Sequence, residues 1–205
     1  PERKVNISWN YGYFTVLDKT AFFPEGGGQT ADKGVIGDAK VFDVQEIDGE
    51  IYHFTDKPLS VGEPHVAHLN FEERFDKMQN HSGEHIVSGI VNKKFGFENV
   101  GFHLSDSVVS LDFDGPLTRK DLDEIELLAN RAVQQNVSIT AYYPKTEDLK
   151  NIAYRSKLDL TENVRLVIID GYDVCACCAP HVSTTGQIGV IKLLQFEKHK
   201  NGTRI

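Results

Sequence analysis

The stretch NFEERFDKMQNHSGEHIVSGIVNKKFG, residues 70–96, separates two differently patterned parts of this chain of 205 residues. Bulky apolar, small and histidine side chains recur in it every three or four positions, which predicts a helix from Phe71 to about Phe95. Asn70 is the expected N-cap and Gly96 the expected end of this helix. The positions on its predicted stripe are Phe71, Phe75, Met78, Ser82, His85, Gly89 and Val91.

The sequence before this helix, residues 5–68, has the pattern of short β-strands. Hydrophobic runs at 14–17, 34–37, 40–44 and 51–54 are separated by turn residues. Asp48-Gly49 between the last two runs is a hairpin signal. Several short strands at this spacing predict a small β-barrel.

The sequence after the helix mixes both periodicities. A second helix is expected at 118–136, capped by Thr118, and strands are expected within 100–113 and at 139–143, 164–169 and 188–196. The predicted fold class is therefore α+β. A small N-terminal β-barrel, residues 1–68, precedes an α+β domain, residues 69–205, with an antiparallel sheet and packed helices.

Composition and charge indicate an ordinary soluble globular protein, with 40% hydrophobic and 25% charged residues. No run approaches the ~20 apolar residues of a membrane helix, and the first residues do not resemble a signal peptide. A net charge of −8 argues against a general nucleic-acid binder, although a local basic face can still contact RNA. The chain starts without Met and stops within a strand-like pattern, so we expect it to be trimmed from something slightly longer.

The three cysteines, Cys175, Cys177 and Cys178, lie within four positions, too close to pair easily in disulfide geometry. Their odd number and the lack of a secretion signal favour a reducing, cytoplasmic location, with metal binding as the leading reason for the cluster. Small buried hydrophobic side chains are the alternative, which we favour for Cys175.

Two pairs of metal-ligating residues share the same spacing. His81 and His85 are four apart on the predicted helix and so lie on one face, about one turn apart. Cys177 and His181 are also four apart, in a loop that contains Cys178 as well and precedes a strand. Imidazole and thiolate ligands together suit one tetrahedral zinc ion. Spacing alone leaves open whether Cys177 or Cys178 is the thiolate.

Glu84 completes a His-x-x-Glu-His pattern, the signature of inverzincin peptidases in which the Glu is the general base. A glutamate on the solvent side of the helix is the favoured alternative. Glu25-Gly26-Gly27-Gly28-Gln29 allows positive φ and close backbone approach to a ligand, but it matches neither the P-loop nor the dinucleotide fingerprint. A tight turn is the simpler interpretation of that segment, and only Gln29 hints at a ligand.

Taken in order, the motif FFPEGGGQ at 22–29, His81-x3-His85 and Cys177-x3-His181-Val182 resemble the AlaX family, free-standing relatives of the editing domain of alanyl-tRNA synthetase. VRLVIIDGYD at 164–173 and VGFHL at 100–104 are also similar to that family, so the resemblance covers nearly the whole chain. Ala179-Pro180 departs from the Gly-Thr common in the synthetase version of the Cys–His loop. That difference affects the expected shape of the pocket wall and removes none of the candidate ligands.

The resemblance implies a metal-dependent aminoacyl-tRNA deacylase that clears Ser-tRNA(Ala), with Gly-tRNA(Ala) as an open alternative. The implied partner is the acceptor end of mischarged tRNA(Ala), and the implied cofactor is one zinc ion. It further implies a substrate-binding turn made of Gly27, Gly28 and Gln29, with Gln29 facing the catalytic pocket. The implied zinc ligands are His81, His85, Cys177 and His181.

His103 is a second candidate catalytic residue beside Gln29, because its strand is expected to pass near the helix that carries His81. A strand histidine with a satisfied hydrogen bond is the alternative. Basic side chains such as Arg155 and Arg165 are candidates for a local RNA-binding face, or for ordinary solvated charge. Three rival functions remain at this point: a zinc peptidase using Glu84, a non-catalytic zinc and RNA-binding module, and the related editing domain of threonyl-tRNA synthetase.

Overall fold

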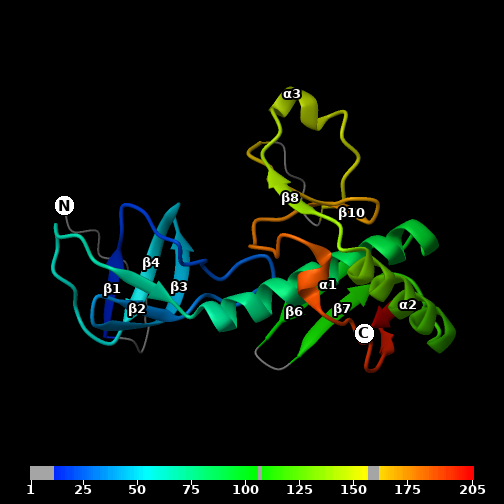
Figure 1. Ribbon diagram of the computed structural model, residues 1–205, viewed down its shortest axis with the longest axis horizontal. Helices are drawn as coiled ribbons and strands as arrows, with labels where there is room; N and C mark the ends of the chain where they lie inside the picture. Colours follow the sequence, from blue (N-terminus) through cyan, green and yellow to red (C-terminus); the bar gives the residue numbers. More distant parts are fainter. Residues whose placement is uncertain (1–11, 106–107, 157–161) are drawn as a thin grey trace. The chain divides into compact units, whose positions relative to one another are not determined.

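The computed structural model describes residues 12–105, 108–156 and 162–205 (Figure 1). The chain divides into two compact units, which are described separately. The first consists of Pro1–Glu25 and Thr30–Arg74, and the second of Gly26–Gln29 and Phe75–Ile205. The glycine-rich turn therefore belongs to the second unit, although the sequence on both sides of it belongs to the first.

The first unit is a five-stranded antiparallel sheet in the order β1-β4-β3-β2-β5. Its hydrophobic core includes Phe22, Ile36 and Val44, all buried. The predicted hairpin between β3 and β4 is confirmed, because Asp48 and Gly49 both take the positive φ that such a turn requires. The strands are β1 (Tyr13–Val16), β2 (Gly34–Ile36), β3 (Ala39–Ile47), β4 (Glu50–Thr55) and β5 (Ala67–Leu69).

The predicted barrel is not confirmed, because this sheet is open. β1 and β5 are its two edges, and no described strand joins them. Closing a sheet into a barrel needs hydrogen bonds between its first and last strands along a continuous stagger. Here β1 has four residues and β5 has three, which offers little backbone for such pairing.

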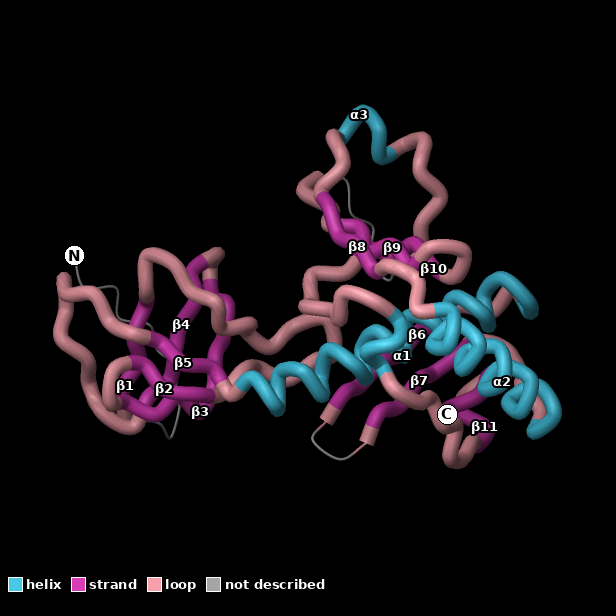
Figure 2. The backbone as a smooth tube through the Cα atoms, viewed as in Figure 1, coloured by secondary structure: helices cyan, strands magenta, loops and turns pink. Residues whose placement is uncertain are grey.

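The second unit packs two helices against a four-stranded sheet in the order β11-β12-β7-β6 (Figure 2). Ile86 of α1, Ile125 of α2 and Phe113 of β7 meet in one buried core. Mixed helices and antiparallel sheets agree with the predicted α+β class. The elements are α1 (Phe71–Phe95), α2 (Arg119–Gln135), β6 (Asn99–Leu104), β7 (Val109–Phe113), β11 (Glu197–His199) and β12 (Gly202–Arg204).

Both predicted helices are confirmed with their ends. Asn70 Oδ1 accepts from the backbone N–H of Glu73 at 3.4 Å, and Gly96 follows α1 with φ +72°. At α2, Thr118 and Asp121 form a reciprocal capping box, and Asn136 ends the helix in the left-handed conformation. None of the helices within the described ranges is long and apolar enough to span a bilayer.

A smaller antiparallel sheet, in the order β10-β9-β8, carries the segments that lead to the cysteines. Its strands are β8 (Ile139–Tyr142), β9 (Leu166–Ile169) and β10 (Asp173–Ala176). A short helix α3 (Thr146–Leu149) and a 3-10 turn η1 (Thr185–Ile188) complete the unit. The pairing of Cys175 with Val167 places the end of β10, and so the loop that follows it, at a defined position.

The strand predicted at 188–196 is wrong: after η1 these residues form an irregular segment. Ile191 and Leu193 form backbone hydrogen bonds with side chains of α2 instead of with a neighbouring strand. Asn130 accepts from the N–H of Ile191 and donates to its carbonyl, and Glu126 accepts from the N–H of Leu193. Ile191 and Leu193 are buried, so the alternating pattern reflects one-sided burial and not sheet pairing.

Candidate metal centre

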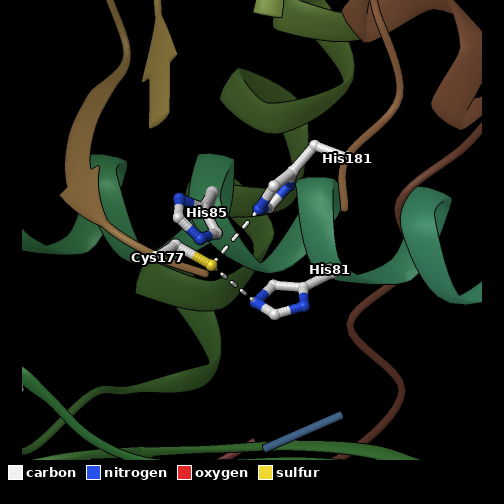
Figure 3. Close-up of side chains that lie close together, drawn as sticks. All are labelled: His81, His85, Cys177 and His181. Atoms are coloured by element: carbon white, nitrogen blue, oxygen red, sulfur yellow. Dashed lines mark hydrogen bonds between the residues drawn. The ribbon is translucent and has the colours of Figure 1, made fainter. Parts of the chain in front are cut away.

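Four side chains from distant parts of the sequence converge within the second unit (Figure 3). His81 and His85 lie one turn apart on α1, while Cys177 and His181 belong to the loop after β10. One ligand atom from each lies within 4.8 Å of all the others. The two histidines of α1 are buried, and the other two residues are partly exposed. The structure therefore brings together all four of the predicted ligands.

The spacing of these atoms fits a tetrahedral zinc site. Cys177 Sγ lies 3.6 Å from His81 Nε2 and 3.4 Å from His181 Nε2. With Zn–N near 2.0–2.1 Å and Zn–S near 2.3 Å, two ligands at the tetrahedral angle are about 3.5 Å apart. The observed separations are thus those of neighbouring ligands of one ion. Cys178, in contrast, is exposed and does not belong to this group.

Each of the three histidines has a polar partner at its other ring nitrogen. His81 Nδ1 lies 2.9 Å from Gln29 Oε1, and His85 Nδ1 lies 3.0 Å from Asp173 Oδ2. Amide and carboxylate oxygens only accept, so both Nδ1 atoms carry hydrogen and each Nε2 can offer its lone pair to an ion. His181 Nδ1 lies 3.0 Å from Ser82 Oγ, which can accept in the same way.

His85 belongs to a buried chain of charges. Asp173 accepts from Arg155 Nε at 2.7 Å and from Arg155 Nη2 at 2.8 Å, besides its contact with His85. Burial lowers the pKa of His85, but hydrogen bonds to Asp173 and Cys177 and the charge of Glu84 raise it to about 10. Burial raises the pKa of Asp173, whereas its contacts with His85 and Arg155 bring it below its ordinary value. An ion that binds His85 must therefore displace a proton.

His181 has the opposite electrostatic setting. Burial, followed by the charges of His85 and His81, lowers its pKa well below the ordinary value of 6.5. Its imidazole is therefore already neutral, as a metal ligand must be.

Arg165 fixes the loop that carries the other two ligands. Its Nη1 donates to the carbonyl oxygens of Cys177 at 2.8 Å and Ala179 at 2.9 Å. The N–H of Cys177 in turn donates to the Arg165 carbonyl at 3.0 Å. Arg155 and Arg165 are both half-buried in these contacts and support the site, and their part in an RNA-binding face stays a prediction.

Glu84 is buried, so the prediction that it lies on the solvent side of the helix is wrong. Its Oε1 accepts from Ser88 Oγ and Asn99 Nδ2, each at 2.6 Å. Its Oε2 lies 3.8 Å from His85 Nε2. The sequence pattern alone does not distinguish a buried glutamate from an exposed one at this position. The packing of β6 against α1 decides which face of the helix is covered.

The glycine-rich turn reaches the same centre through Gln29. Gly27 and Gly28 have φ of +60° and +83°, and a Cβ on Gly28 would lie 2.7 Å from the carbonyl oxygen of Phe102. The N–H of Leu104 donates to the Gly28 carbonyl at 2.9 Å, which ties the turn to β6. The positive φ and the close approach to Phe102 both require glycine at position 28. Gln29 is buried, with 1% of its surface exposed.

His103 is exposed on β6, whereas the ring of its neighbour Phe102 packs against His81 with 4.7 Å between ring centroids. Successive side chains of a strand point to opposite faces. The prediction that this strand passes near His81 is therefore confirmed. The side chain that contacts His81 is that of Phe102, and the structure does not bring His103 into the group.

Comparison with known proteins adds the family. Residues 164–205 match the model of the threonyl and alanyl tRNA synthetase second additional domain. The chain is 33% identical over 193 residues to alanyl-tRNA editing protein Aarsd1 of Mus musculus, and 32% identical over 200 residues to alanyl-tRNA editing protein AlaX-L of Pyrococcus horikoshii. The chain is a homologue of these AlaX-type alanyl-tRNA editing proteins over most of its length.

The matches cover most of this chain but only part of each relative. They span 92% of the chain and 47% of Aarsd1, and 93% of the chain and 50% of AlaX-L. An alanine–tRNA ligase of Ignicoccus hospitalis is 35% identical over 201 residues, which are 92% of this chain and 22% of that protein. The chain thus spans about half of the two editing proteins and about a fifth of the ligase.

Sequence reasoning missed three residues of the chain that support the three candidate histidine ligands. Asp173, Ser82 and Phe102 contact His85, His181 and His81 respectively. Asp173 is a charged residue between hydrophobic neighbours, four positions before Cys177. That position was the available signal that it supports the site. Ser82 and Phe102 gave none, because their roles depend on packing between distant segments.

Proposed function

We propose that this chain hydrolyses the aminoacyl ester of mischarged tRNA(Ala) in trans, with Ser-tRNA(Ala) as its main substrate. The observation that carries the proposal is the convergence of three histidine Nε2 atoms and the Cys177 thiol, with the other ring nitrogens held by Gln29, Asp173 and Ser82. The names of the relatives, alanyl-tRNA editing proteins, support the reaction class.

The residues present fit zinc, and the four converging side chains would hold it. When bound there, zinc supplies Lewis-acid polarisation of an ester carbonyl or an anchor for the substrate. Around it, Asp173 and Gln29 keep hydrogen on the Nδ1 atoms of His85 and His81, and Arg165 holds the Cys177–Ala179 backbone. These contacts pre-orient the ligands, which keeps the cost of assembling the site low.

An enzyme that attaches alanine to tRNA needs a separate editing site, because its alanine pocket also admits serine. A pocket built for alanine rejects serine poorly, since one added hydroxyl costs only a few kcal/mol. A site that hydrogen-bonds the hydroxyl discriminates better, because its buried polar groups remain unpaired when alanine binds. We therefore expect the acceptor end of Ser-tRNA(Ala) to be the substrate, with Gly-tRNA(Ala) as the alternative.

The test is single-turnover deacylation of Ser-tRNA(Ala), Gly-tRNA(Ala) and Ala-tRNA(Ala), by protein with and without prior removal of metal. Rapid, metal-dependent loss of serine with alanine spared supports the proposal. A folded, zinc-loaded protein that spares all three would contradict it.

A non-catalytic zinc module is the second candidate, and the number of ligands favours it. Four protein ligands are typical of structural zinc sites, whereas catalytic sites keep one position open. In that case Cys177→Ala unfolds the second unit, and tRNA is bound without turnover. Circular dichroism and a filter-binding assay of the same preparations separate this function from editing.

The peptidase alternative depends on Glu84. Both donors to its Oε1, Ser88 and Asn99, are buried with it, which restrains the carboxylate. Glu84→Gln would abolish a peptidase that uses this residue as base. An editing enzyme should retain most of its Ser-tRNA(Ala) activity in the same variant, and loss of all deacylation would show that Glu84 takes part.

A further inference from the structure

Among the described residues, the side-chain amide of Gln29 has a hydrogen-bond partner at its oxygen and none at its nitrogen. Its Oε1 accepts from His81 Nδ1 at 2.9 Å. Its Nε2 is buried and has no hydrogen-bond partner in the described part of the chain. Buried donors in native proteins nearly always have a hydrogen-bond partner. A buried donor without one needs an explanation, and a bound ligand is one such explanation.

The unpaired amide nitrogen lies close to the candidate metal centre. The oxygen and nitrogen of one amide are about 2.3 Å apart. Gln29 Nε2 is therefore no more than about 5.2 Å from His81 Nδ1. With 1% of Gln29 exposed, this donor is shielded from bulk water.

The amide is also held rigidly. The backbone of Gln29 and Gly26 exchanges two hydrogen bonds, at 3.0 and 3.1 Å, and the turn is tied to Leu104 through Gly28. Because an amide is planar, the contact of Oε1 with His81 limits the directions in which the two N–H bonds can point. A shielded donor on a fixed turn, without a partner among the residues that the structure describes, is suited to stabilise a developing negative charge.

We propose that Gln29 Nε2 donates a hydrogen bond to the ester carbonyl oxygen of the substrate as that oxygen becomes negative. This inference rests on the proposed deacylase function and assigns its oxyanion donor. Water oxygen adds to the carbonyl carbon, and the carbonyl π electrons move to the oxygen that Gln29 contacts. When they return, the bond to the ribose oxygen breaks. That oxygen takes a proton from the attacking water, and the amino acid leaves as a carboxylate with release of the second proton.

Gln29→Glu tests the donor without removing the contact to His81. The carboxylate still accepts from His81 Nδ1, so zinc affinity should stay the same or rise. The lost N–H should lower the single-turnover rate on Ser-tRNA(Ala) and Gly-tRNA(Ala) by about 100- to 1,000-fold, and equally for both. Gln134→Glu, the same change at an exposed position of α2, should leave both rates unchanged.

Binding gives a readout apart from turnover. Two non-hydrolysable compounds are compared by calorimetry: the 3′-amide of serine on 3′-amino-3′-deoxyadenosine, with a planar carbonyl, and a phosphonamidate of the same outline, with a tetrahedral anionic centre. Gln29→Glu should weaken the phosphonamidate by about 100-fold and the amide by much less.

Several outcomes would overturn the assignment while leaving deacylation intact. These are an unchanged rate in Gln29→Glu, loss of serine hydrolysis with glycine hydrolysis retained, and equal weakening of both compounds. Selective loss of serine would make Gln29 a reader of the serine hydroxyl. Failure of the wild-type protein to hydrolyse either tRNA would instead refute the proposed function itself. Zinc titration and thermal unfolding of each variant distinguish these results from misfolding.

Discussion

Asp173 offers the sharpest test of how the candidate metal centre is supported. Its side chain is 2% exposed and accepts from both His85 and Arg155, whose side chain is 12% exposed. In Asp173→Asn, one oxygen becomes an NH2 group. If the remaining oxygen faces His85, the new NH2 group faces the guanidinium of Arg155, which can only donate. The reverse orientation removes the acceptor from His85.

The expected size follows from burial. Removing the countercharge of a buried ion pair costs about 3–5 kcal/mol, because the other charge stays buried. Loss of the group that orients a metal-ligating histidine costs about 10- to 100-fold in metal affinity, or about 1.4–2.7 kcal/mol. We therefore expect Asp173→Asn to lose about 3 kcal/mol of unfolding free energy and at least tenfold in zinc affinity.

The assays are urea unfolding of the zinc-free protein and competition for zinc with a chromophoric chelator. Asp112→Asn is the matched control, since Asp112 also accepts from an arginine, Arg204, at 2.6 and 2.7 Å. That pair is more exposed, at 18% and 40%, and distant in sequence from the ligands, so its loss should cost under about 1 kcal/mol and leave zinc affinity unchanged. Equal effects of the two substitutions, or an unchanged zinc affinity in Asp173→Asn, would refute the supporting role.

Three further predictions concern other parts of the chain. Gly28→Ala should lower the free energy of unfolding in urea by about 2–5 kcal/mol. The alanine would have to adopt a left-handed φ, and its Cβ would lie 2.7 Å from the Phe102 carbonyl oxygen. A loss below about 1 kcal/mol would show that the turn adapts. Burial lowers the pKa of His53, so the folded protein binds fewer protons there than the unfolded chain does. The free energy of unfolding is therefore highest above the unfolded pKa of about 6.5 and declines as the pH falls below that value. Urea unfolding at pH 7.5 and 5.5 should show a fall in stability that is smaller in His53→Gln, and identical falls would exclude the effect. Removing metal with a chelator should lower the melting temperature of the wild-type protein and not that of Cys177→Ala, and an unchanged wild-type melting temperature would count against a bound ion.

Helix α1 shows how far local pattern reaches. Asn70 and Gly96 bound the helix as predicted, because caps and stops act over a single turn. The i, i+4 spacing of His81 and His85 placed both on one face without any knowledge of the fold. The sequence also contained the Cys177–His181 pair, but only resemblance selected Cys177 over Cys178.

The irregular segment at 188–196 shows where local pattern fails. Alternation indicates one-sided burial, and a strand is only the commonest structure that produces it. Here the partners are Asn130 and Glu126 of α2, about 60 residues away in sequence, and no local signal identifies them. The open sheet of the first unit has the same cause, since closure depends on pairing between its first and last strands.

The sequence by itself determined the two long helices α1 and α2, the hairpin at Asp48-Gly49 and the set of residues able to bind a metal, because each depends on neighbours within a few positions. Only the tertiary structure decided that Glu84 is buried, that Phe102 and not His103 contacts His81, and that Asp173 and Arg165 support the ligands. Within the described ranges it also left the side-chain nitrogen of Gln29 without a hydrogen-bond partner. These features arise from packing between segments that are far apart in the chain, where burial and hydrogen-bond partners are set by the whole fold and not by local spacing.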